Sequence, residues 1–400
     1  MSDENIDSYV VPGFLANGIH CGIKEDGRKD LALIFSEKPA RAAAVFTTNR
    51  FKAAPVLLDM ERIKRGQAQA ILTNSGNANA ANGPAGYNDA LAMSRALSSK
   101  LDIRDDLVLV ASTGVIGRRL PVQKIEAGMA DLVAGLNADG IPTAEEAMMT
   151  TDKFPKMACR RGVCGSKEIT VCGIAKGAGM IEPHMATLLT YVLTDAEVEG
   201  GTLSRVFRLA VDKTFNAVSV DGCMSTNDTA VILANGRAGN AVIKGRSRDL
   251  TRFRNLLMEV LADLSQAVVR DGEGTTKVIE IVVEEAKSIG DAKKVAYAIA
   301  NSNLVKTAFF GGDPNWGRII QAAGATGIPL PVDSVGIYFE GIPVFLNGQG
   351  VYGQEQTVAE VMKKTSIRLN VKLGMGGKMF RLHASDLSFE YVEINAHYTT

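Results

Sequence analysis

Two different periods of apolar and polar residues run along the chain and predict strands and helices in turn. Short apolar runs are typical of buried strands, whereas apolar residues repeated every three or four positions are typical of amphipathic helices. In the first half this pattern predicts strands at 31–35, 43–47 and 107–111, and helices at 90–100 and 121–136. The run 107–111 ends in Ser112-Thr113-Gly114, which indicates a tight turn.

The second half shows longer helices and then a strand-rich end. It predicts strands at 188–193, 230–234 and 277–283, helices at 203–215 and 250–270, and further strands at 335–339, 344–346 and 389–394. We place a soft boundary near residue 285, which gives domains of residues 1–285 and 286–400. The elements indicate an α+β protein built in layers and do not form a plain βαβ series.

Length, composition and charge narrow the class of protein. The 400 residues exceed one ordinary compact domain, and contents of 46% hydrophobic and 22% charged residues match a folded chain. The 44 basic residues balance 44 acidic residues, so no net field favours nucleic acid or an anionic membrane. The N-terminus lacks the basic start and apolar core of a signal peptide, and no apolar run reaches about 18 residues. We therefore expect no nucleic-acid partner, no membrane span and a cytoplasmic location.

Cysteine usage points away from both disulfides and metal. The five cysteines form an odd and scattered set without a Cys-x-x-Cys pair: Cys21, Cys159, Cys164, Cys172 and Cys223. This distribution favours a reducing compartment over a disulfide framework. The nearest approach to a metal cluster is the group of three between residues 159 and 172, whose spacing fits no common zinc pattern. We therefore predict no metal site.

Two glycine-rich segments come close to nucleotide-binding signatures without completing them. Residues 312–319 have the glycine spacing of a phosphate loop, but they lack the lysine and hydroxyl that reach phosphate and magnesium. Residues 176–179 begin like a dinucleotide turn and lack its third glycine. The sequence also has no Gly-x-Ser-x-Gly nucleophile elbow. We expect no bound cofactor.

The segment from Lys176 to Asp195 carries the most specific chemistry. A glycine-rich loop containing Pro183 leads to a small residue, Ala186, and then to Thr187 at the head of an apolar run. Hydrolysis of the Ala186–Thr187 bond would give Thr187 a free α-amine, whose unperturbed pKa is about 7.7–8.0. That amine can act as the base for its own hydroxyl. Spacing alone, however, favours the plainer interpretation of a loop that enters a core strand.

Further sequence blocks along essentially the whole chain favour self-cleavage over this plainer interpretation. Together with the segment above, the blocks resemble the ornithine acetyltransferase family, the bifunctional glutamate N-acetyltransferases of arginine biosynthesis. They are Phe46-Thr-Thr-Asn49, Thr73-Asn-Ser-Gly-Asn-Ala-Asn79, Ser112-Thr-Gly-Val-Ile-Gly117, Met149-Thr-Thr-Asp152, Asp271-Gly-Glu-Gly-Thr-Thr-Lys277, Gly312-Asp-Pro-Asn-Trp-Gly-Arg318 and Ile394-Asn395. Two positions depart from the family: Ala178 stands where serine is frequent and His184 where asparagine is common. Neither belongs to the scissile pair.

The resemblance implies a fold and an assembly. The fold is an αββα sandwich like that of N-terminal-nucleophile hydrolases, with different connectivity, followed by a smaller α+β C-terminal domain whose tail returns to the active site. Self-cleavage between Ala186 and Thr187 gives an α chain of residues 1–186 and a β chain of residues 187–400. Two copies of each chain form an α2β2 heterotetramer.

The implied reaction is a ping-pong acetyl transfer. Thr187 attacks the acetyl carbonyl of N2-acetylornithine, ornithine leaves, and the amine of glutamate then takes the acetyl group from the threonine. A covalent intermediate divides one difficult amide exchange into two easier steps. No residue of the sequence decides whether acetyl-CoA also serves as a donor for making N-acetylglutamate.

The site residues of the family carry over position by position. Thr113 and Gly114 match the oxyanion pair that stabilises the tetrahedral intermediates. The implied substrate contacts are Thr150 (or its neighbour Thr151), Lys176, Thr187, Glu273, Asn395 and Thr400. We hypothesise that Lys176 pairs with the substrate carboxylate, while Glu273 meets the ammonium of acetylornithine or steadies the Thr187 amine.

Alternative interpretations remain open from the sequence. A self-cleaving amidase or aminopeptidase would use the same nucleophile and admit water to the acyl-enzyme, but Lys176, Glu273 and Asn395 favour the transferase. A non-enzymatic binding module fits poorly with so many small polar and glycine motifs. His184 offers an acid/base partner three residues before the nucleophile, although the family tolerates asparagine there. Cys223 offers a thiol nucleophile, but we expect a buried, inert cysteine.

Overall fold

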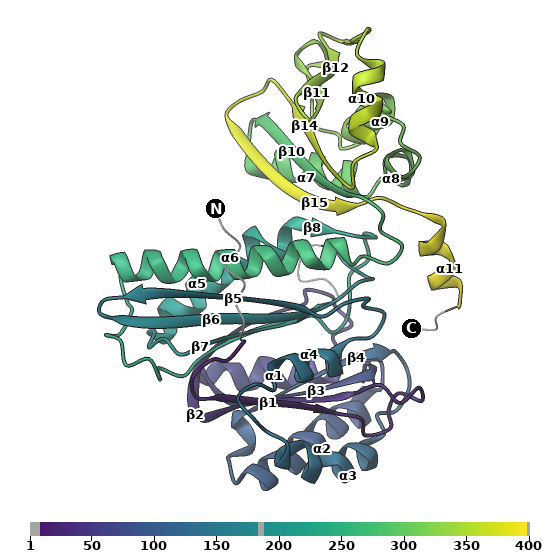
Figure 1. The fold of residues 1–400 in the computed structure, drawn as a ribbon. Helices are drawn as coiled ribbons and strands as arrows, with labels where there is room; N and C mark the ends of the chain where they lie inside the picture. The colour runs from purple at the N-terminus through teal and green to yellow at the C-terminus, as the bar shows by residue number, and fades with distance from the viewer. Residues whose placement is uncertain (1–8, 183–187, 398–400) are drawn as a thin grey trace.

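Two β-sheets organise the protein, and helices cover each of them (Figure 1). The computed structural model describes residues 9–182 and 188–397. The first sheet has eight strands in the order β4-β3-β2-β9-β7-β6-β5, with β1 paired to β2. Its strands are β1 (Phe14–Ile19), β2 (Leu31–Phe46), β3 (Gln67–Asn77), β4 (Val108–Val115), β5 (Lys156–Cys164), β6 (Lys167–Lys176), β7 (Leu189–Thr194) and β9 (Thr229–Ala234).

The 16-residue strand β2 joins the two halves of this sheet. Its first six residues pair with β1, and its last six, from Arg41 on, pair with β9. A register shift between Phe35 and Ala40 marks a bulge, and bulges bend a strand and increase its twist. The two halves can therefore face each other across one core, in which Phe14 of β1 and Tyr191 of β7 are both buried.

Helices cover the outer faces of both halves and give the first sheet its layers (Figure 1). The half with β3 and β4 carries α1 (Ala54–Arg62), α2 (Gly83–Leu101) and α3 (Val122–Ala134), and the half with β5–β7 carries α5 (Gly200–Lys213) and α6 (Arg248–Arg270). The short helix α4 (Ile141–Met148) contributes to the core between the halves. Helix, sheet, sheet and helix make the αββα sandwich that the family resemblance implies.

Helix α6 shows how the sequence specifies one of these layers. Its deeply buried apolar residues recur every three or four positions and form one stripe: Phe253, Leu257, Leu261, Leu264 and Val268. The hydroxyl of Ser247 accepts the N–H of Leu250 at 3.1 Å and caps the first turn. Each fully buried side chain of this size contributes about 1.5–3 kcal/mol relative to exposure, so the stripe fixes α6 on β5 and β6.

The second sheet has seven strands in the order β13-β12-β11-β14-β10-β15-β8. Its strands are β8 (Val218–Ser219), β10 (Val278–Ala286), β11 (Gly336–Phe339), β12 (Ile342–Leu346), β13 (Gln349–Gly350), β14 (Ser366–Lys372) and β15 (Lys378–Ser385). The later helices are α7 (Ile289–Ala300), α8 (Asn303–Phe310), α9 (Trp316–Gly324), α10 (Glu355–Met362) and α11 (Phe389–His397), and short 3-10 turns are η1 (Ile63–Arg65), η2 (Asp105–Leu107), η3 (Phe215–Ala217) and η4 (Val332–Ser334). Strand β8 comes from the chain before α6 and pairs with β15, so it ties the first part of the protein to this sheet.

The domain boundary near residue 285 stays a proposal. Glu285 lies at the end of β10, whose partner strands β14 and β15 both belong to the second sheet. Within the part of the chain that the structure describes, no helix is both long and apolar enough to cross a bilayer.

Two predicted elements were wrong, and the strands predicted at 31–35 and 43–47 are parts of the single strand β2. The other predicted strands and helices lie close to their predicted positions. Residues 389–394 form α11 rather than a strand. Its apolar residues Phe389 and Val392 are 84% and 62% exposed, so their presence does not reflect burial on a sheet. Residues 112–114 continue β4 rather than turning, because a register shift against β3 at Gly76 accommodates them.

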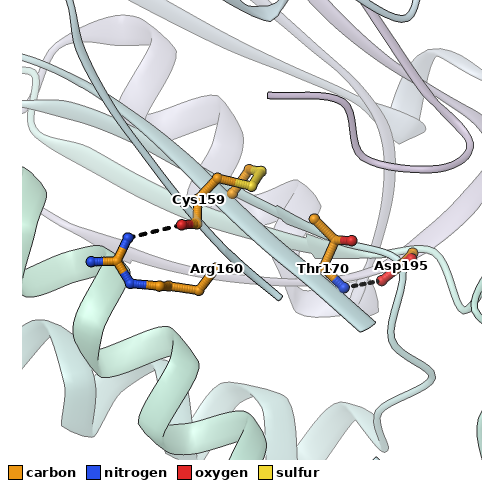
Figure 2. The surroundings of a disulfide bond; sticks show 5 residues. Cys159, Arg160, Thr170 and Asp195 are labelled. Atoms are coloured by element: carbon orange, nitrogen blue, oxygen red, sulfur yellow. Dashed lines mark hydrogen bonds between the residues drawn. A yellow bond between two sulfur atoms is a disulfide. The ribbon is translucent and has the colours of Figure 1, made fainter. Parts of the chain in front are cut away.

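A disulfide bond joins Cys159 of β5 to Cys172 of β6 (Figure 2). The two residues are direct partners in the antiparallel register, and each is 1% exposed. The expectation of cysteines without disulfides is wrong for this pair. Their separation of 13 residues does not reveal the strand register, which the hairpin sets. Figure 2 also shows Asp195, whose Oδ1 accepts the N–H of Thr170 at 2.7 Å.

We predict that two leucines of α5 differ sharply in their effect on stability. Leu203 is fully buried and Leu209 is 52% exposed. Leu203→Ala should lower the free energy of unfolding by about 2–5 kcal/mol because it leaves a cavity. Leu209→Ala should stay within about 0.5 kcal/mol. Urea denaturation measures both, and equal losses would contradict the packing of α5 on the sheet.

Candidate active site

A cavity of about 130 Å³ lies where strand ends of the first sheet meet the C-terminal helix α11. It is lined by Ala78, Thr113, Gly114, Ile116, Thr150, Thr151, Lys176, Gly179, Met180, Asp221, Cys223, Ser225, Asn227, Glu273, Tyr391 and Asn395. Every predicted site residue that the structure describes is among them. Residues as far apart in the sequence as Ala78 and Asn395 therefore converge on one place.

Ala186, Thr187 and Thr400 lie outside the described residues, and so does His184. The described neighbour of Thr187 is Leu188, whose N–H donates to Oδ1 of Asp228 at 3.0 Å. Leu188 lines a small hollow beside the cavity together with Thr113 and Lys176, which also line the cavity itself. The chain therefore passes close to the predicted oxyanion and substrate residues directly after position 187.

The end of β4 brings backbone donors to the cavity. Gly114 has φ +126°, and a Cβ there would lie 2.4 Å from the carbonyl carbon of Gly76, so the position requires glycine. The side-chain amide of Asn227 donates to the carbonyl oxygens of Ala78 (2.6 Å) and Ser112 (2.8 Å). Asn227 thus ties the backbone of β4 at Ser112 to the residue that follows the neighbouring strand β3. This gives Thr113 and Gly114 the rigidity that an oxyanion site needs.

A buried ion cluster lies behind Lys176. The ammonium of Lys156 contacts Asp152 at 2.7 Å and Asp271 at 2.5 Å, and all three side chains are fully buried. Lys176 lies farther from Asp152, at 3.9 Å, and is itself 3% exposed. Burial opposes the charge of Asp152, but Lys176 and Lys156 outweigh it and hold the pKa of that carboxyl well below its usual range. Lys156 contacts the carboxylates of Asp152 and Asp271 at shorter distances than Lys176 does. The ammonium of Lys176 can therefore bind a ligand in the cavity.

The loop with Thr150 and Thr151 is held from two sides. The N–H of Thr150 donates to Asp152 Oδ2 at 2.9 Å, and its carbonyl oxygen accepts from Arg28 at 2.9 Å. Lys24 donates to the carbonyl oxygen of Met149 at 2.6 Å. Burial, and then the charge of Arg28, lower the pKa of Lys24 to about 8. Both threonines line the cavity, so its geometry does not choose between them as the predicted substrate contact.

Glu273 and Asn395 meet across the cavity. The amide of Asn395 donates to Oε2 of Glu273 at 2.8 Å, although 122 residues separate them. The carboxylate packs so closely on Gly179 that a Cβ there would lie 2.4 Å from it. The N–H of Glu273 donates to the carbonyl oxygen of Ala178 at 2.9 Å. Helix α11 therefore brings Asn395 back to the cavity.

Sequence reasoning missed the carboxyl of Asp221. Its oxygens accept the N–H groups of Met180 (2.6 Å) and Ile181 (2.9 Å), in the loop that follows β6. Met180 has φ +60°, which is unfavourable for a side chain of its size and is held by these bonds. Burial raises the pKa of Asp221. The dipeptide Asp221-Gly222 was the available signal, since such pairs mark turns.

The expectation that Cys223 is buried was wrong. The residue is exposed and lines the cavity, where we expected a buried, inert thiol. The preceding Gly222 has φ +72°, in the left-handed region that favours glycine. Burial of the sulfur and the nearby carboxyl of Asp221 raise the pKa of Cys223, so the thiol is not activated as a nucleophile.

Comparison with known proteins identifies the family. The model of the ArgJ family matches residues 15–400. The chain belongs to the ArgJ family. An arginine biosynthesis bifunctional protein of Geobacter sulfurreducens is 48% identical over 98% of this chain and 100% of that protein. Another from Caldanaerobacter subterraneus subsp. tengcongensis is 47% identical over 97% of each chain. The recognition made from the sequence is confirmed, and the assignment to acetyl transfer in arginine biosynthesis is supported over the amidase alternative.

Solved structures of this family are also similar to the chain. The arginine biosynthesis bifunctional protein of Bacillus halodurans has a TM-score of 0.50 and 35% identity, and the match covers 52% of this chain and 98% of that one. The polypeptide in that crystal is thus about half as long as this ArgJ chain. An ornithine acetyltransferase of Mycobacterium tuberculosis, solved in complex with ornithine, has a TM-score of 0.39 and 39% identity over 45% of this chain.

We predict that the ion cluster makes a large contribution to stability. Lys156→Met leaves two buried carboxyls without their cation and should lower the free energy of unfolding by about 3–5 kcal/mol. The control is Lys153→Met, whose pair with Glu390 is about half exposed on both sides and should contribute about 0–1 kcal/mol. Urea denaturation compares the two variants. A Lys156→Met protein as stable as the control would refute the assigned role of the cluster.

Proposed function

We propose that this ArgJ chain cleaves itself between Ala186 and Thr187 and moves acetyl from N2-acetylornithine to glutamate through an acetyl-Thr187 intermediate. The observation that carries this proposal is the convergence of Thr113, Gly114, Lys176, Glu273 and Asn395 on one cavity beside Leu188. These residues supply an oxyanion site, a cation and a carboxylate, which match a substrate with an acetyl carbonyl, a carboxylate and an ammonium.

The chemistry follows from the groups present. The hydroxyl oxygen of Thr187 attacks the acetyl carbon, and its proton passes to the free α-amine of the same residue. Negative charge develops on the carbonyl oxygen and is stabilised by Thr113 and the N–H of Gly114. The tetrahedral intermediate collapses when the ornithine nitrogen takes the proton and leaves. The amine of glutamate then repeats the sequence in reverse on the acetyl-threonine.

Two charged side chains of the cavity position the substrate. Lys176 pairs with the α-carboxylate of either amino acid, because its ammonium is buried and its nearest carboxylate lies 3.9 Å away. Glu273 accepts the side-chain ammonium of acetylornithine, and Asn395 holds the Glu273 carboxylate at 2.8 Å. The hydroxyl groups of Thr150 (or its neighbour Thr151) and Thr400 complete the contacts.

Further parts of the proposal concern assembly, location and the second donor. Cleavage at Thr187 divides the chain into residues 1–186 and 187–400, and the half-length polypeptide of the Bacillus halodurans relative supports such a division. We propose an α2β2 assembly in the cytoplasm. The word bifunctional in the names of the relatives supports acetyl-CoA as a second donor, with no resident cofactor.

Thr187→Ala should abolish both cleavage and acetyl transfer. We expect one full-length band on a denaturing gel, where the wild type gives two fragments, and no N-acetylglutamate from acetylornithine and glutamate. Thr187→Ser, which keeps the hydroxyl, is the matched control and should cleave and transfer. Acetyl transfer by the Thr187→Ala variant would refute the mechanism. Acetate release that ignores glutamate would favour the amidase alternative.

Glu273→Gln should weaken the binding of acetylornithine. A hydrogen bond to a charged group contributes about 1.5–3 kcal/mol, so KM should rise by about 10–100-fold. The control is Glu390→Gln, since Glu390 lies on the same helix as Asn395 and is about half exposed. Steady-state kinetics on both variants tests this role. Unchanged KM and kcat in Glu273→Gln would remove Glu273 from the substrate site.

A further inference from the structure

A groove of about 640 Å³ lies between the end of α6 and the second sheet. Helix α6 contacts β5 and β6 of the first sheet and β8 and β15 of the second, so it lies between the two sheets (Figure 1). The groove is lined by Gln266, Arg270, Thr275, Thr276, Lys277, Val278, Glu280, Thr365, Ser366 and His383. The described residues that line the candidate active site are all different ones. Sites for small molecules have volumes of about 300–1,000 Å³, so the groove has room for a ligand.

The floor of the groove is the polar face of the second sheet. Ile279 of β10 is buried in the apolar core with residues of α7, α8 and α9, so the next residue, Glu280, points to the opposite face. The register places Glu280 between Arg368 of β14 and His383 of β15. Arg368 and Arg381 approach the Glu280 carboxylate at 3.5 and 3.1 Å. The acidic side chain in the groove is therefore already paired with two cations.

Two further cations line the groove without a carboxylate partner among the described residues. Arg270, in the last turn of α6, is exposed, and its charge offsets the negative end of the helix dipole. Lys277 donates to the carbonyl oxygen of Phe309 at 2.6 Å. Burial lowers the pKa of His383, so its ring is an uncharged hydrogen-bonding group near neutral pH. The groove therefore carries an excess of positive charge.

The chemistry of these groups suits a phosphate. A guanidinium presents a fork of N–H donors that matches phosphate oxygens, and an ammonium adds a compact positive charge. Thr365 and Ser366, where β14 begins, are exposed and add hydroxyl donors from another side of the groove. A phosphate group carries a charge of about −1.5 to −2 and three acceptor oxygens. Two cations and two hydroxyl groups match it better than they match the single charge of a carboxylate.

We propose that this groove binds a small organic phosphate, and that Arg270 and Lys277 hold its phosphate group. The volume of the groove leaves room for the organic part of the molecule beside the polar face of the sheet. Binding at this site does not depend on the function proposed for the active site.

The turn between Arg270 and Lys277 links the groove to the active site. Asp271, in this turn, contacts the ammonium of Lys156 at 2.5 Å, and Glu273 lines the candidate active site. A phosphate that contacts both Arg270 and Lys277 bridges the two ends of the turn and stabilises the conformation that presents Glu273 to the cavity. Bound ligand therefore raises the affinity for acetylornithine. This consequence rests on the proposed function.

The test measures binding to the full-length protein by isothermal titration calorimetry. The probes are ADP and coenzyme A, and adenosine, which lacks a phosphate, is the uncharged control. The variant is Arg270→Gln. Its matched control is Arg254→Gln, which removes an exposed arginine of the same helix that does not line the groove. If Arg270→Gln fails to fold, Lys277→Gln makes the test.

We expect ADP, coenzyme A or both to bind the wild type with a Kd below about 1 mM, and adenosine to bind at least about tenfold more weakly. Arg270→Gln should weaken the binding by about 10–100-fold, because it removes a charged hydrogen-bond donor, and Arg254→Gln should leave it unchanged. Tighter binding of coenzyme A would identify the proposed acetyl donor as the source of the phosphate, and equal or tighter binding of ADP would identify a free nucleotide. Failure of both probes to bind, or equal affinity in the wild type and Arg270→Gln, would overturn the proposal.

Steady-state kinetics measures the link to the active site. With the bound probe at saturation, the KM for acetylornithine should fall by at least about fivefold in the wild type and stay unchanged in Arg270→Gln. An unchanged KM in wild-type protein that binds the probe would refute the link through Glu273. Calorimetry is done without substrate, so a wild type that binds the probe but transfers no acetyl would count against the proposed function and not against the groove.

Discussion

The buried ammonium of Lys156 holds together the segments that carry the site. Its partner Asp152 also accepts the N–H groups of Thr150 and Gly177, at 2.9 and 2.7 Å. Its other partner, Asp271, follows α6 and stands two residues before Glu273 in the sequence. The substrate loop, the end of β6 with Lys176 and the turn with Glu273 are thus fixed against one another by one cation. Because the three side chains are fully buried, their charges interact more strongly than they would at the surface.

Two glycines let other groups of the site approach the backbone closely. Gly114 lies against Gly76 across β4 and β3, and Gly179 lies against the carboxylate of Glu273. The second sheet is also part of this construction, because β15 leads into α11 and α11 carries Asn395 to Glu273. The pairing of β8 with β15 anchors that sheet to the first part of the chain. The ArgJ site therefore needs both sheets in place.

Periodicity predicted what depends on local burial, and it failed where distant contacts decide. The stripe of α6 and the apolar run of β7 are visible in the sequence because each buries one face or both. Helix α11 was predicted as a strand, since its exposed Phe389 and Val392 contribute β-like composition without a sheet to pack on. The disulfide of Cys159 and Cys172 depends on strand register, which spacing does not encode.

The residues of the candidate site also divide into those that the sequence indicated and those that only the fold reveals. Thr113, Lys176 and Glu273 were reached through a family resemblance, and spacing alone would have left them as a turn and two charges. Asp221 and Asp228 were missed because their roles are contacts to backbone N–H groups of other segments. Such partners become visible only once the chain is folded.

The central claim is that Thr187 carries the acetyl group, and one measurement addresses it most directly. Enzyme incubated with N2-acetylornithine in the absence of glutamate is denatured in acid, and its fragments are weighed and sequenced by mass spectrometry. The account predicts the mass of one added acetyl group on the fragment that begins at Thr187, located on that first residue and removed by glutamate. An acetyl group on another residue, or an unmodified fragment from a preparation that transfers acetyl, would contradict it.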